Sequence, residues 1–72
     1  MYYRNAVMIP VAGLWKFYPE HMLAVNVHNG AVAQIVMEQN GTMKVAACNV
    51  PAQWMLDKLC SFLNHFFAGT TK

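Results

Sequence analysis

The side chains with the greatest capacity for chemistry in this 72-residue chain are three histidines, two cysteines and three acidic residues. His28 and Cys48 are the two that the expected sheet brings closest, near one end of the same face. Their spacing matches no zinc-binding pattern, and a structural zinc site needs four ligands. We therefore expect no metal site.

Covalent catalysis would need a nucleophile beside a histidine, a third group that orients the histidine, and a cleft. The only acids, Glu20, Glu38 and Asp57, fall at turns or on the polar side of a helix. The glycines are isolated, so no glycine-rich loop is present to hold a phosphate. We expect a protein that is not an enzyme and carries no cofactor.

Two Asn-Gly dipeptides, Asn29-Gly30 and Asn40-Gly41, lie between runs of apolar residues. This pattern is typical of β-hairpins, because a type I′ turn needs positive φ at both central residues. We expect strands over residues 22–28, 31–38 and 42–48. A further strand over residues 6–17 precedes them at a sheet edge, because Pro10 cannot donate to a ladder.

The last segment has helical periodicity. Apolar residues between positions 52 and 66 follow the i, i+3, i+4, i+7 spacing of an amphipathic helix. Asn49 is the expected N-cap and Gly69 the expected residue after the last turn. The predicted fold is therefore a single α+β domain over residues 1–72. It consists of a four-stranded antiparallel β-meander and one C-terminal amphipathic helix packed on one sheet face.

Two-residue loops at both Asn-Gly pairs fix the register of the sheet. Val27 then pairs with Val32, Val36 with Val45, and Gln34 with Ala47. A three-residue loop with a bulge also fits an Asn-Gly pair, and the register of the second hairpin is the less certain. One face of this sheet is rich in valine, and we expect the helix to cover it. Its members are Leu23, Val25, Val27, Val32, Val36, Val45 and Ala47, with Met55, Leu59, Phe62 and Phe66 as the helix row above them.

The second face is small and apolar, although a solvated antiparallel face should be polar. A four-residue turn between the first two strands would add two aromatic residues to it. We predict that this face is an interface formed by Trp15, Phe17, Met22, Ala24, Ala33, Ile35, Met37 and Ala46. Trp54 lies on the opposite side of the helix and is a candidate contact for a separate partner, since tryptophan is enriched at interface centres.

Composition supports association. Hydrophobic residues make up 57% of the chain, and charged residues 11% against about 25% in ordinary domains. This is more apolar side chain than so short a chain can bury, so we expect a homo-oligomer, with a dimer favoured. The two cysteines suit a reducing compartment, and no apolar stretch is long enough to span a bilayer. We expect a cytoplasmic protein with no membrane partner.

These observations predict a small non-enzymatic protein-interaction module, such as an inhibitor, adaptor or regulatory subunit, that self-associates through the second sheet face. The alternative is a sheet-based single-stranded nucleic-acid-binding protein, with Trp15 and Phe17 stacking on bases. Nucleic acid is the less favoured partner, because the net charge is only +2 and the five cations are scattered.

Overall fold

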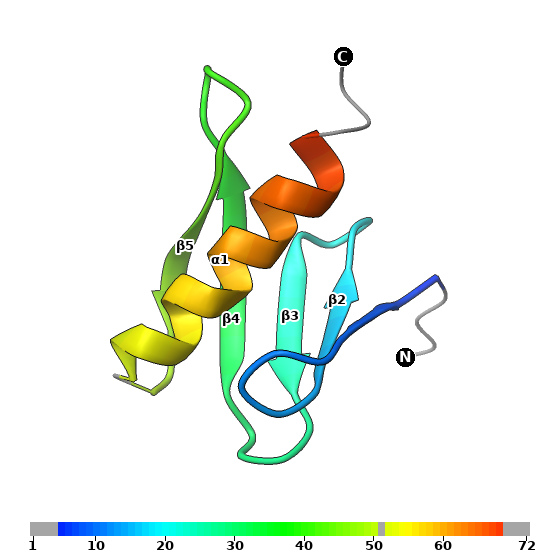
Figure 1. Cartoon of the computed structure of the whole chain (residues 1–72), viewed down its shortest axis with the longest axis vertical. Helices are drawn as coiled ribbons and strands as arrows, with labels where there is room; N and C mark the ends of the chain where they lie inside the picture. The colour runs from blue at the N-terminus through cyan, green and yellow to red at the C-terminus, as the bar shows by residue number, and fades with distance from the viewer. Residues whose placement is uncertain (1–4, 51, 69–72) are drawn as a thin grey trace.

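The computed structural model describes residues 5–50 and 52–68. Five strands form one antiparallel sheet in the order β1-β2-β3-β4-β5, and one helix lies across it (Figure 1). The elements are β1 (Val7–Ile9), β2 (Trp15–Tyr18), β3 (Leu23–Asn26), β4 (Val32–Met37), β5 (Met43–Cys48) and α1 (Gln53–Ala68). The α+β meander and its C-terminal helix are confirmed, whereas the predicted count of four strands is one too few.

The additional strand comes from the segment 6–17, which forms a hairpin instead of one edge strand. β1 and β2 pair from Val7 opposite Phe17 to Ile9 opposite Trp15. Pro10 ends β1, since it has no N–H to donate. The chain then reverses through Ala12 and Gly13, whose φ angles are 52° and 103°. Glycine takes positive φ without the steric cost that other residues bear, so Gly13 makes this reversal possible.

The turn between β2 and β3 has four residues, 19–22, which is the turn length that adds the aromatic residues of β2 to the second face. Tyr18 pairs with Leu23, and Phe17 pairs with Ala24. Trp15 and Phe17 therefore share a face with the alanines of the central strands.

The first Asn-Gly pair lies in a four-residue loop, residues 27–30, rather than a two-residue turn. The backbone N–H of Asn26 donates to Ala31 O at 2.8 Å and closes the loop. Val25 consequently pairs with Val32, so the predicted pairing of Val27 with Val32 is wrong. The shift is two residues, which leaves the side chains of β3 and β4 on their predicted faces.

The second Asn-Gly pair lies in a three-residue loop, which is the alternative that the sequence left open. The N–H of Glu38 donates to Thr42 O at 2.8 Å across this loop. Ile35 pairs with Val45, so the predicted pairing of Val36 with Val45 is wrong. A bulge at Ala46 then restores the register, and Gln34 pairs with Ala47 as predicted.

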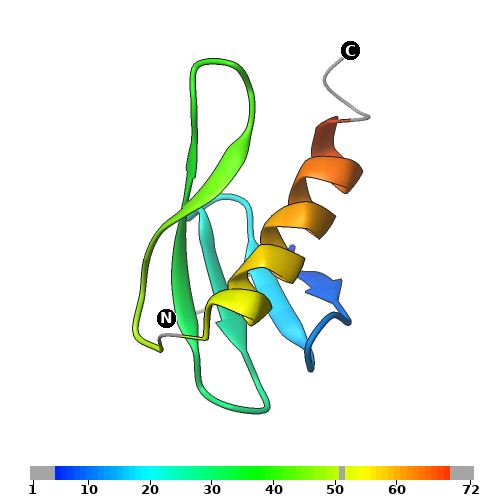
Figure 2. The same ribbon diagram turned by 60° about the vertical axis from the view of Figure 1, so that its left-hand side comes forward.

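The helix covers the second face of the sheet, which carries the alanines of the central strands (Figure 2). The prediction that it covers the valine-rich face is wrong. The physical reason is complementary size: large helix side chains fill the space above small strand residues, and the aromatic rings of β2 fill the flank. Valine is favoured on either face of a strand, so its abundance does not identify the core. The buried apolar side chains are Ile9, Trp15, Phe17, Ala24, Ala31, Ala33, Ile35, Met43, Met55, Leu56, Leu59 and Leu63.

The buried row of α1 is also rotated from its predicted position. Leu56 and Leu63 are buried, whereas Phe66 is 48% exposed. The C=O of Ala52 accepts the first helical hydrogen bonds. Asn49 does not cap the helix, because its Oδ1 accepts from the N–H of Val32 at 2.7 Å. The residue expected to follow the last turn, Gly69, lies outside the described residues.

Candidate functional site

The side of the sheet opposite α1 is the candidate site, and no described element covers it (Figure 2). Strand alternation places every second side chain of the sheet on this side. We call it the outward face. Its members are Met8, Lys16, Tyr18, Leu23, Val25, Val32, Gln34, Val36, Lys44 and Ala47.

Three cross-strand rows make up the centre of the outward face. Val25 pairs with Val32 in one row, and Val36 pairs with Lys44 in another. The middle row runs from Leu23 through Gln34 to Ala47. Val32 and Val36 are 38% and 43% exposed, so their methyl groups remain in contact with solvent. An exposed apolar patch on an antiparallel sheet is a candidate interaction surface, because a solvated face is usually polar.

Lysines are the charged residues of the outward face within the described chain. Lys16 on β2 pairs with Val25, and Lys44 on β5 pairs with Val36, so both cations lie directly beside the apolar residues. Lys44 Nζ is 3.7 Å from Glu38 Oε2, and both side chains are exposed. Such an exposed ion pair contributes little stability.

The interface predicted from sequence lies mostly inside the protein. Trp15, Phe17, Ala24 and Ala33 are fully buried beneath α1, and Ile35 is nearly so. These residues cannot contact a partner while the helix is in place. Of the other three, Met22 is half-buried against the core, and Met37 and Ala46 are exposed.

Five members of the valine-rich face that was predicted to form the core lie on the outward face instead: Leu23, Val25, Val32, Val36 and Ala47. Val45 is on the helix side, since it pairs with Ile35 and packs against the core, and Val27 lies in the β3–β4 loop. Alanine on the central strands is the signal that could have separated the two faces. A helix with several leucines packs closely on small side chains, whereas it would be held away from a surface of valines.

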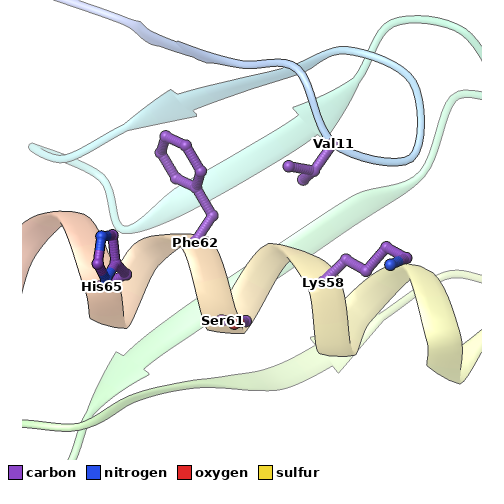
Figure 3. Close-up of a pocket in the computed structure, with 5 residues that line it drawn as sticks. All are labelled: Val11, Lys58, Ser61, Phe62 and His65. Carbon is purple, nitrogen blue, oxygen red and sulfur yellow. The ribbon is translucent and has the colours of Figure 1, made fainter.

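The helix presents a second exposed region. Trp54 is 59% exposed, which agrees with its predicted position on the outer side of the helix. An open groove of about 330 Å³ lies between α1 and the β1–β2 loop and is lined by Val11, Lys58, Ser61, Phe62 and His65 (Figure 3). No acidic side chain lines it, so Ser61 and His65 lack the third group of a catalytic triad.

Cys60 lies in a smaller cleft between β5 and α1, together with Asp57 and Asn64. Burial raises the pKa of the Cys60 thiol, and the negative charge of Asp57 adds to this effect. A hydrogen bond from Val45 acts in the opposite direction but does not reverse the shift. Because the thiolate is the reactive form, the site disfavours Cys60 as a nucleophile.

Within residues 5–50 and 52–68, no three His, Cys, Asp or Glu side chains are grouped closely enough to hold a metal ion. His28 and Cys48 therefore have no third metal ligand beside them in these ranges. Within the same ranges, no helix has the length and apolar character needed to cross a bilayer. Searches against protein-family models, curated proteins and solved structures give no match to this chain.

Proposed function

We propose that this chain is a small non-enzymatic protein-interaction module that self-associates through the outward face. The observation that carries the proposal is the uncovered apolar centre of the sheet, formed by Leu23, Val25, Val32 and Val36. Burial of such a surface against a second copy removes apolar area from water, which is the main driving force of association. The module acts as an inhibitor, adaptor or regulatory subunit, with a dimer as its basic assembly.

We also propose a second contact surface, at Trp54 on α1, for a different protein partner. Trp54 is exposed on the helix, on the opposite layer of the protein from the outward face. A self-associated protein would therefore still present Trp54 to a different protein partner. Tryptophan anchors are common at the centres of such contacts.

The proposed location is the cytoplasm. Both cysteines in the described chain, Cys48 and Cys60, are free thiols. Free thiols are typical of reducing compartments, whereas small secreted domains usually carry disulfides.

Binding of single-stranded nucleic acid has less support than it had from sequence. The two aromatic residues that would stack on bases, Trp15 and Phe17, are both fully buried. Base stacking requires exposed rings, and phosphate contacts require more cations than Lys16 and Lys44 supply.

Adjacent residues of β4 provide a matched test of the proposal. Val36 lies on the outward face and Met37 on the helix side, and they are 43% and 52% exposed. Val36→Glu places a carboxylate in the proposed contact, and we expect the monomer to stay folded because Val36 is already exposed to solvent. Met37→Glu is the same change on the other side of the same strand.

Light scattering coupled to size exclusion gives the mass of each variant. We expect the wild type and Met37→Glu to associate, and Val36→Glu to be monomeric at the same concentration. A monomeric wild type at several hundred micromolar would refute the proposed self-association.

A further inference from the structure

The two Asn-Gly pairs are chemically reactive sites as well as turn signals. Asparagine is among the thermolabile residues of proteins. A glycine that follows it has no Cβ to keep its backbone nitrogen away from the asparagine side-chain carbonyl. Asn29-Gly30 and Asn40-Gly41 are both exposed, and a Cβ at either glycine would meet nothing within 4 Å. The two glycines also have similar φ angles, 75° and 86°, so they offer the same attacking group.

The reaction that such a pair undergoes is deamidation, which takes up water and releases ammonia. The glycine nitrogen loses its proton to solvent base and attacks Cγ of the preceding asparagine. As the N–Cγ bond forms, the Cγ–Nδ2 bond breaks, and Nδ2 takes up a proton and leaves as ammonia. Water then opens the resulting succinimide ring at either carbonyl, which gives aspartate or isoaspartate. Water is therefore the only co-reactant, and nothing is oxidised or reduced.

Two hydrogen bonds are equivalent in the two loops. Each asparagine Oδ1 accepts from the backbone N–H two residues further on, at 2.9 Å in both cases. Each glycine N–H donates to a backbone carbonyl, again at 2.9 Å, with Asn26 O as the acceptor in one loop and Glu38 O in the other. The loops therefore do not differ in these bonds, which must break before the glycine nitrogen attacks.

Three further hydrogen bonds hold only the first pair. Asn29 Nδ2 donates to Met55 Sδ at 3.1 Å, and the N–H of Asn29 donates to Asn26 Oδ1 at 3.2 Å. Gly30 O accepts from Asn49 Nδ2 at 3.3 Å. Asn26 is fully buried and Met55 nearly so, which anchors the pair to the core. The Asn29 side chain cannot turn toward the Gly30 nitrogen without breaking these contacts.

Asn40 has no comparable anchors among the residues that the structure describes. Its Nδ2, which becomes the leaving group, makes no hydrogen bond within them, and the partners of Asn40 and Gly41 are Thr42 and Glu38, which close the loop. We propose that Asn40 is a site of spontaneous deamidation in the folded protein, and that the anchors of Asn29 protect the first pair. The product adds a carboxylate to the β4–β5 loop and, as isoaspartate, lengthens its main chain by one atom.

Peptide mapping by mass spectrometry, after incubation of the folded protein in mildly alkaline buffer, measures the rate at each asparagine. We expect Asn40 to react at least about tenfold faster than Asn29, because three hydrogen bonds together are worth at least that factor. In guanidinium chloride the two rates should converge, since the same residue follows each asparagine. Equal rates in the folded protein, or a faster rate at Asn29, would overturn the proposal. So would a folded protein in which Asn40 stays intact while the unfolded chain reacts.

Met55→Leu tests the cause of the protection. It removes the sulfur that binds Asn29 Nδ2 and nearly conserves side-chain volume, so the core remains packed. We expect the rate at Asn29 to rise severalfold and the rate at Asn40 to stay unchanged. Leu63→Met, about two turns further along α1, makes the reverse exchange in the core and should change neither rate. Circular dichroism checks that both variants fold, and an unchanged Asn29 rate in folded Met55→Leu would refute the protection by this anchor.

Discussion

Asn64 of α1 binds both backbone polar groups of Met43 on β5. The N–H of Met43 donates to Asn64 Oδ1 at 2.7 Å, and Asn64 Nδ2 donates to Met43 O at 2.9 Å. One turn earlier on the helix, Cys60 Sγ accepts from the backbone of Val45. The helix thus occupies the edge of β5 where another strand would otherwise pair. The β5 edge is therefore occupied at Met43 and Val45, and the association that we propose is assigned to the outward face.

Asn64→Ala should destabilise the protein by about 1–3 kcal/mol, because both Met43 groups lose their partner. Urea unfolding measures the change, and Gln39→Ala in an exposed loop is the control. Amide hydrogen exchange at Met43 should also become faster in Asn64→Ala. Unchanged exchange at Met43 would show that the side-chain bonds do not hold the β5 edge.

Asn26→Ala should be more damaging, by about 3 kcal/mol or more, because three hydrogen bonds of one fully buried side chain are lost together. Asn26 is fully buried, donates to Ala12 O at 3.1 Å and accepts from the N–H groups of His28 and Asn29. It thereby fixes the β1–β2 and β3–β4 loops to each other. Thermal unfolding measures the effect, and a loss below about 1 kcal/mol would contradict this role.

Gly13→Ala and Gly41→Ala separate backbone strain from steric contact. Both glycines have positive φ, at 103° and 86°. A Cβ at Gly13 would lie 3.2 Å from Asn26 Nδ2, whereas a Cβ at Gly41 would meet nothing within 4 Å. We expect a cost of about 1–2 kcal/mol for Gly41→Ala and a clearly larger one for Gly13→Ala. Equal losses in urea unfolding would show that the Asn26 side chain moves aside freely.

The raised pKa of the Cys60 thiol predicts a pH dependence of stability. Burial of the thiol is the main cause, so the folded state binds the thiol proton more tightly than the unfolded state. The resulting stabilisation is complete below the ordinary thiol range and is lost as the pH rises through the folded pKa. Unfolding free energies measured at pH 7 and above pH 9 should fall with pH, and fall less in Cys60→Ala. An equal fall in both proteins would assign the dependence to other groups.

Much of the fold could be predicted from sequence, because it depends on local signals. The Asn-Gly pairs identified both central hairpins, and the apolar spacing identified α1. The loop lengths could not be predicted, since the Asn26 side chain ties the β3–β4 loop to Ala12 of the β1–β2 loop, and a bulge at Ala46 compensates the three-residue loop between β4 and β5. Local sequence does not contain these contacts between distant residues.

The candidate site was harder to predict, because the choice between two apolar faces depends on packing. The valine-rich strands have high β propensity on either face, so they gave no information about which one the helix covers. Ala24 and Ala33 are small enough to leave room for a helix, and both share the buried core with Leu59 and Leu63. This one choice exchanges the core for the outward face, although the side chains of β3 and β4 keep their predicted alternation between the two faces.

The most direct test of the outward face as the contact surface is an isotope-filtered nuclear Overhauser experiment on a mixture of labelled and unlabelled protein. We predict intermolecular signals from the methyl groups of Leu23, Val25, Val32 and Val36, and none from the buried core. Signals that instead come from Trp54 and Phe66 on the helix, or no intermolecular signal at millimolar concentration, would contradict the account.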